Sequence, residues 1–417
     1  MMFPAASSAN SPDIKLPLKF LVTGVIAFFL LNFLFFWAIP AFGTGNFRGP
    51  VMWTVAHLTL LGWGTMIAMG AMYQLVTVAF QVPLYSEKLG TIQYYIYTIG
   101  VLGLLWGFFS FNPFILNLFG FLAFLGALLF IYNIFKTIGK MSKQTYISAF
   151  VLSSVSYLFL TVLLGLILAL NLKWSFLGSL YNRLFPIHIL LGLIGWFTLL
   201  IIGFSFKMVP MFTLSHGFSE KWPRWILTLF HGGIISTSIS LILEEKFFIV
   251  IGLILIAAAF FFFAVHVKGI ISKKMKKKLD IGIETSLKAI VIGLILFILF
   301  PVSLIWYGEN KLILTLIYLF IYGWISLSIL GYLYKIIPFL WWTAKYSTEI
   351  GKSNVPQLKD LISESLGKKI FLLVIIGTIG FSISILTGYS SILYLMQSIT
   401  MVGVILYTYS VLNVFRK

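Results

Sequence analysis

The stretch MWTVAHLTLLGWGTMIAMGAMYQLVTVAF at residues 52–80 is apolar over a length that crosses a lipid bilayer, and it carries one imidazole, His57. Its Gly-Trp pair recurs twice: the glycines of the three pairs stand at 62, 195 and 323, which are 133 and 128 residues apart. In each copy a second glycine follows the tryptophan by seven residues, and an aromatic residue follows that glycine by three. Such recurrence indicates internal repetition. We therefore predict three units, at approximately 17–140, 145–275 and 283–417.

The composition places the chain in a membrane. Hydrophobic residues make up 60% of its 417 residues and charged residues 10%, with a mean hydropathy of +1.05. One soluble core cannot bury that much apolar surface, so the lipid bilayer must be the solvent of the chain. The chain has no cysteine, which excludes disulfides, iron-sulfur clusters and thiolate metal ligation. Any metal ligand must therefore be a histidine, a methionine, a tyrosine or a carboxylate.

Apolar runs of about 20 residues, broken by proline, glycine and charge, predict twelve membrane-spanning helices, four in each unit. The fold class is therefore an all-α membrane protein with one polytopic domain over residues 1–417. The repeated Gly-Trp pair predicts a helix-packing face with a tryptophan at the membrane interface. The predicted spans are 17–40, 51–78, 90–111, 114–136, 145–171, 184–212, 223–243, 247–270, 283–306, 311–340, 368–388 and 391–414.

The net charge of +18 suits either a nucleic-acid partner or loops that stay in the cytoplasm. Placing the N-terminus inside puts most of the 29 basic residues on the cytoplasmic side, as the positive-inside rule requires. We therefore expect a multi-pass protein of the cell membrane with both termini in the cytoplasm and no nucleic-acid partner. The lysine-rich run at 273–278 either lies in solvent or holds anionic lipid headgroups.

Four of the five histidines fall inside predicted spans, and three of these four are candidate ligands. His57 lies six residues into its helix, about 9 Å below the outer surface, where a polar ring costs free energy unless it is bonded or ligated. His188 begins the equivalent helix of the second unit, so the two imidazoles lie at similar depth and suit an axial pair on a haem, or a haem and a separate metal. His231 precedes two glycines near mid-membrane, which favours either a flat ligand or tight helix packing. His216 and His266 are interpreted as solvated, capping or packing residues.

Twelve helices in three arcs of four, with histidines on the second, sixth and seventh, resemble the catalytic subunit I of the haem-copper oxidase superfamily. The best local match, HLTLLGWGTMIAMGAMYQLV at 57–76, looks like the helix-two signature of the cytochrome cbb3 and nitric oxide reductase branches. The resemblance implies that His57 is an axial ligand of a b-type haem. It also implies that His188 stands at the family's copper or iron site, and that His231 lies on the helix that normally carries a His-His pair.

The chain departs from that family at the tenth helix, which normally supplies two histidines. Leu316 and Tyr318 stand at those positions, and a glycine follows His231 where a second histidine is normal. Tyr318 is placed to hydrogen-bond a haem propionate or to ligate iron. The resemblance therefore implies an incomplete catalytic centre, similar to histidine-poor relatives that include the haem- and copper-containing proteins associated with nitric oxide tolerance.

Three functions remain open at this point. The first is a haem-binding membrane protein in electron transfer, nitric oxide handling or haem and copper handling, with His57, His188, His231 and Tyr318 as cofactor ligands. Such a protein has a respiratory or electron-transfer partner, and whether it is an oxidoreductase stays undecided. The second is a cofactor-free transporter or permease on the same scaffold, which the small residues of the sixth helix would suit. The third is an assembly partner of a respiratory complex.

Overall fold

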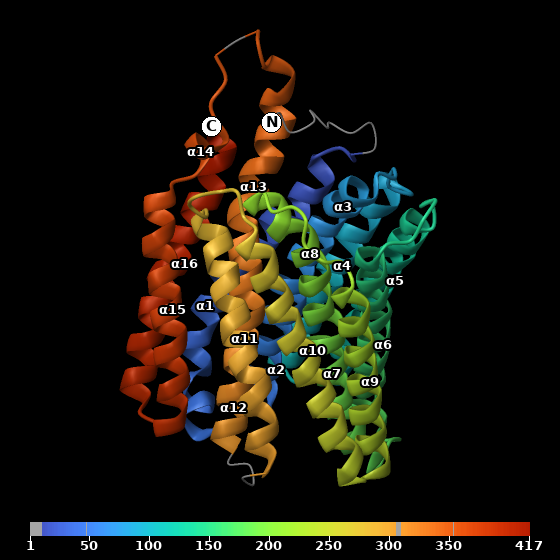
Figure 1. The fold of residues 1–417 in the computed structure, drawn as a ribbon. Helices are drawn as coiled ribbons and strands as arrows, with labels where there is room; N and C mark the ends of the chain where they lie inside the picture. Colours follow the sequence, from blue (N-terminus) through green and yellow to red (C-terminus); the bar gives the residue numbers. More distant parts are fainter. Residues whose placement is uncertain (1–10, 47, 306–309, 353) are drawn as a thin grey trace.

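The computed structural model describes residues 11–46, 48–305, 310–352 and 354–417, and Figure 1 shows them as a bundle of long helices that run along a common direction. Within these residues, twelve helical segments are long and apolar enough to cross a membrane. They match the twelve predicted spans one for one. The prediction of an all-α, multi-pass membrane protein is therefore confirmed.

In three of the spans, the α-helix changes to a π-helical segment and back without a break in the chain of helical residues. The short helix α14 (Leu358–Leu361) and the 3₁₀ turns η4 (Ser347–Glu349) and η5 (Asn413–Arg416) complete the fold. The spans are α1 (Lys15–Thr44), α2-η1-α3 (Pro50–His57, Leu58–Thr65, Met66–Phe80), α4 (Glu87–Phe109), α5 (Pro113–Ile138), α6 (Tyr146–Trp174), α7-η2-α8 (Leu180–Leu190, Leu191–Thr198, Leu199–Thr213), α9 (Trp222–Leu243), α10 (Lys246–Ser272), α11 (Ile281–Ile305), α12-η3-α13 (Asn310–Leu319, Phe320–Ser326, Leu327–Tyr346), α15 (Glu364–Thr387) and α16 (Ser390–Leu412).

The three interrupted spans, 50–80, 180–213 and 310–346, form the centre of the bundle, and we call them the central helices. Their most apolar windows are 72, 78 and 67% buried, against 28–50% for the other nine spans. A helix surrounded by protein on most sides must be apolar all round, and each central helix is. The outer helices keep one face for lipid. The functional groups predicted at His57, His188 and Tyr318 all lie on central helices.

Local sequence signals fix where several helices begin. Asn112 accepts hydrogen bonds from the amides of Phe114 and Ile115 at 3.0 and 3.2 Å, and Pro113 follows it as the first residue of α5. A side-chain cap and a proline at the first helical position are both typical of a helix N-terminus. The first amides of a helix have no intrahelical acceptor, so the cap side chain accepts from them, and proline has no amide N–H that needs one. Thr145 and Ser148 form a reciprocal capping box at the start of α6.

The tenth span is longer than the predicted 311–340, because α13 passes through Pro338 and continues to Tyr346. A proline removes one backbone donor, but neighbouring helices support such helices in membranes. The extra turn is anchored by Trp342, whose indole donates to the carbonyl of Pro356 at 2.6 Å. The loop that follows contains the short helix α14.

One acidic residue at the membrane boundary is held by two lysines. Asp280, just before α11, accepts ion pairs from Lys276 at 2.7 Å and Lys335 at 2.6 Å. Burial opposes ionisation of this carboxyl, but the two lysines outweigh burial and lower its pKa below the ordinary value. The contact with Lys335 ties α13 to the loop that precedes α11.

Candidate functional site

Each central helix changes to a π-helical segment where its Gly-Trp pair stands, at η1, η2 and η3. A π segment widens the helix by one residue per turn and shifts the side chains that follow around the axis, and such segments are frequent at functional sites. The three segments lie at corresponding places in helices far apart in the sequence. No local composition rule predicts them.

The π segments carry a closed ring of hydrogen bonds between the three central helices. Each helix supplies a tryptophan and, two residues later, a serine or threonine. Every indole donates to the hydroxyl of a different central helix, so each helix gives one bond and receives one. We call these six residues the tryptophan ring: Trp63 donates to Ser326 at 3.4 Å, Trp324 to Thr198 at 3.1 Å, and Trp196 to Thr65 at 3.1 Å.

The ring corrects the prediction that these tryptophans lie at the membrane interface. Trp63, Trp196 and Trp324 are at most 1% exposed, and their indole nitrogens are all used. A buried indole must find an acceptor, and each indole finds it in the Ser or Thr hydroxyl that follows the tryptophan of a neighbouring central helix by two residues. The signal in the sequence is therefore the full pattern Gly-Trp-x-Ser/Thr, in which the hydroxyl residue matters as much as the tryptophan.

Replacing Thr198 with valine is expected to lower the thermal stability of the detergent-purified protein. The change keeps the side-chain shape but leaves the buried indole of Trp324 without its acceptor, which costs about 1–3 kcal/mol. Thr228→Val is the matched control, because the Thr228 hydroxyl is exposed and bonds only to its own helix at Arg224. Equal unfolding temperatures for the two variants would show that the ring contributes nothing.

A cavity of about 250 Å³ lies against the ring, with Thr65 and Trp196 in its wall. The lining is mainly apolar, with leucine and phenylalanine the most frequent residues, and it comes from α1, α2, η1, α4, α5, α6, α7, η2, α12 and η3. The structure brings His57, His188 and Tyr318 to this one cavity. Three of the four residues singled out in the sequence thus share a compartment, although 261 positions separate the first from the last (318 − 57).

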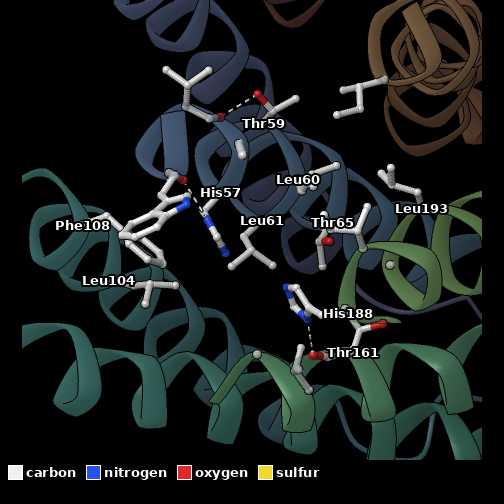
Figure 2. Close-up of a pocket in the computed structure, with 18 of the residues that line it drawn as sticks. His57, Thr59, Leu60, Leu61, Thr65, Leu104, Phe108, Thr161, His188 and Leu193 are labelled. Atoms are coloured by element: carbon white, nitrogen blue, oxygen red, sulfur yellow. Dashed lines mark hydrogen bonds between the residues drawn. The ribbon is translucent and has the colours of Figure 1, made fainter. Parts of the chain in front are cut away.

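The two histidines present the same nitrogen to the cavity. Nδ1 of His57 lies 2.7 Å from the carbonyl oxygen of Trp53, and Nδ1 of His188 lies 3.0 Å from that of Thr161. A carbonyl only accepts, so each Nδ1 carries the proton and each Nε2 keeps a lone pair. The ring centroids are 6.5 Å apart with planes at 20°, and Figure 2 shows the second nitrogen of each ring directed into the space between them.

Backbone carbonyls that fix a histidine tautomer are the usual support of a metal-ligating imidazole. The support comes from different elements: Trp53 precedes His57 by one turn of its own helix, whereas Thr161 belongs to α6. Phe108 also lies against the His57 ring, with centroids 4.4 Å apart. Both rings are thereby held in one orientation before any ligand arrives.

His231 lies elsewhere. Its Nδ1 is 2.7 Å from the hydroxyl of Tyr157 and its Nε2 is 3.1 Å from that of Ser153, so both nitrogens have partners on α6. It does not line the cavity. Its role as a ligand stays a prediction. Within the described ranges, no group of three or more His, Asp or Glu side chains is arranged to hold a metal ion.

The cavity wall also contains buried donors that lack an acceptor. In the described part of the chain, neither the hydroxyls of Tyr318 and Tyr322 nor the indole N–H of Trp53 has a hydrogen-bond partner. The Thr378 hydroxyl lies near that of Tyr318, and the Thr59 hydroxyl lies near that of Tyr322, but neither pair has hydrogen-bonding geometry.

The two tyrosine rings stack at 4.8 Å. Tyr322 was missed in the sequence, although it follows Tyr318 by one helical turn, the spacing that places two side chains on one face.

A search of protein-family models and a search of curated proteins both find no match for this chain.

Proposed function

We propose that the protein is a haem-binding membrane protein of the haem-copper oxidase subunit I type, with an incomplete catalytic centre. It has three pseudo-symmetric units of four helices, and His57 and His188 ligate the same metal ion. The observation that carries the proposal is the pair of Nε2 lone pairs that face one space from two central helices. Both termini lie in the cytoplasm of the cell in this proposal.

The spacing of the two imidazoles fits one metal ion between them. A metal–nitrogen bond of about 2.0–2.1 Å places two opposed nitrogens about 4 Å apart and their ring centroids roughly 6 Å apart. The observed 6.5 Å between centroids matches that value closely. Two histidines that only packed against each other would have no reason to keep this gap, because a buried imidazole lone pair without a partner costs free energy.

The unpartnered donors fit the rest of a haem. Tyr318, Tyr322 and Trp53 offer hydrogen bonds to acceptor oxygens inside an apolar cavity, and haem carries two carboxylates. Each of these three buried donors without an acceptor costs roughly 1–3 kcal/mol of folding free energy, and a ligand with acceptor oxygens would offset this cost. Tyr318 thus keeps the propionate role predicted for it, and Tyr322 joins it.

The volume sets a condition on this fit. About 250 Å³ is slightly below the range of about 300–1,000 Å³ of small-molecule pockets, so a whole porphyrin requires side chains to move. Leu61 stands beside the gap between the two imidazoles, as Figure 2 shows, and its flexible end is the first that must turn away. A copper ion without porphyrin needs no such movement.

His57 and His188 would hold the iron of a bound haem, which would supply one-electron transfer. The chain's own residues bind, orient and insulate that centre. The carbonyls of Trp53 and Thr161 hold the protons on Nδ1, so that both Nε2 atoms stay available. The tryptophan ring closes one side of the cavity, and all three of its indole N–H groups are hydrogen-bonded within the ring. We therefore place the protein in electron transfer, nitric oxide handling or haem and copper handling beside a respiratory partner.

The visible spectrum and the iron and copper contents of the detergent-purified protein test this proposal. A Soret band with about one iron per chain supports a haem between the two histidines. A colourless protein with about one copper per chain keeps the two-histidine site and removes the porphyrin. If neither metal is present and added haem or copper does not bind, the cofactor proposal fails. The transporter or assembly-partner alternative then takes its place.

A further inference from the structure

A second cavity, of about 280 Å³, lies on the outside of the bundle at the seam between α1 and α16. Phe29 of α1 forms one wall, and residues between Ile405 and Arg416 form the other. The lining positions 405, 408, 412 and 416 recur every three or four residues, so they follow one face of the helix. Eleven residues at 1.5 Å each make this groove about 16 Å long. It therefore runs along the helix from mid-membrane to the membrane surface.

The surface end of the groove carries a cation and an amide. Arg416 is exposed at the end of the last span, and the described residues provide it with no ion pair. The amide of Asn413 lines the groove one turn earlier, and its side chain likewise has no hydrogen-bond partner in the described part of the chain. Polar groups with free donors at this depth lie at the level of lipid headgroups.

The corresponding residues at the end of α5 are used differently. Asn133 accepts from the amide of Ser86 at 3.2 Å and donates to its carbonyl at 2.8 Å, which ties the end of α5 to the start of α4. Lys136 lies over the ring of Tyr132 at 5.6 Å. The sequence pattern Asn-x-Phe-basic occurs at 133–136 as Asn-Ile-Phe-Lys and at 413–416 as Asn-Val-Phe-Arg, and the asparagine and the basic residue of the second copy line a groove.

Deeper in the groove, one hydroxyl also lacks a partner. The Oγ1 atom of Thr408 is buried and has no hydrogen bond within the described ranges, although many membrane threonines bond back to their own helix. Around it the walls are apolar, with Phe29, Ile405 and Leu412. A ligand with an apolar chain below and polar linking oxygens above would contact each of these groups.

We propose that this groove binds one phospholipid with a net negative headgroup, whose phosphate contacts Arg416 and Asn413 and whose acyl chain lies along α16. The charge at the groove favours an anionic lipid over a zwitterionic one, and the length of the groove fits most of an acyl chain. Tyr409, 58% exposed at the edge, supplies the interfacial aromatic residue typical of headgroup level. This site is distant in sequence from the histidine cavity and independent of the proposed function.

The site is tested on the full chain in nanodiscs in which phosphatidylglycerol is titrated into phosphatidylcholine. Native mass spectrometry of the purified protein counts the lipid that each variant retains. We expect phosphatidylglycerol to be retained on the wild-type protein and its retention to fall about fivefold in Arg416→Gln, the loss expected for one cation near anionic headgroups. A second variant, Leu412→Trp, fills the groove and is expected to lower retention without removing a charge.

Lys136→Gln is the matched control, because it removes the basic residue of the corresponding pattern, whose asparagine is already hydrogen-bonded to Ser86. It should retain phosphatidylglycerol as the wild-type protein does. Equal retention by Arg416→Gln and Lys136→Gln would overturn the proposal, as would equal binding of phosphatidylcholine and phosphatidylglycerol. If a second copy of the chain or another helix covered the groove instead, native mass spectra would show the complex without bound lipid, which also overturns it.

Discussion

His188→Ala is expected to remove the bound metal together with any Soret band from the purified protein. The variant leaves one imidazole in the cavity, so the ion of the proposed function would lose one of its two ligands. Loss of an outer-shell support alone typically lowers metal affinity about 10- to 100-fold, so loss of a direct ligand should exceed about 100-fold. His57→Ala should give the same loss. Metal analysis and the visible spectrum of each variant, against wild type, measure it.

The control for this pair is His231→Ala. His231 is also an intramembrane histidine with partners on α6, but it lies outside the cavity, so its removal should leave metal content unchanged. A cofactor lost only because the protein misfolds would disappear from all three variants. Thermal unfolding of the three metal-free proteins separates folding from ligation. Loss of metal from His231→Ala, with retention in His188→Ala, would contradict the assignment of the site.

The membrane fold was predictable because it follows from composition and length. Apolar runs of about 20 residues are stable as helices that cross the bilayer, so twelve such runs predict twelve spanning helices. The common depth of His57 and His188 was predictable as well, since helix geometry converts sequence position into distance along the axis. The 6.5 Å distance between the centroids of the two imidazole rings was not predictable, because it depends on how two helices pack whose histidines are 131 positions apart (188 − 57).

Features made by contacts across the bundle escaped prediction. The tryptophan ring needs three π segments and three partners from other helices, and none of these is encoded in a local period. His231 gave an ambiguous signal for the same reason: the hydroxyls of Tyr157 and Ser153 that bond it belong to another helix. A polar residue inside a membrane indicates that it has a bonding partner, but only the tertiary structure shows which group that partner is.

Gly331→Ala is expected to destabilise the protein, whereas the same change at Gly269 should stabilise it slightly. A Cβ on Gly331 would lie 2.5 Å from the carbonyl oxygen of Gly282, so α11 and α13 must separate, at a cost of about 1–3 kcal/mol or more. Gly269 has nothing within 4 Å of an added Cβ, and alanine favours a helix over glycine by up to about 1 kcal/mol.

The opposite signs make this pair a sharp test, because both changes add one methyl group to a membrane helix. Unfolding temperatures of the two variants in the same detergent measure the difference. Gly282→Ala should reproduce the loss at Gly331, since its Cβ would meet the carbonyl oxygen of Gly331 from the other side. If Gly331→Ala were as stable as Gly269→Ala, α11 and α13 would not be in backbone contact. The central helix that carries Trp324 and Tyr318 would then lack the close support by which α11 holds it against the other two central helices.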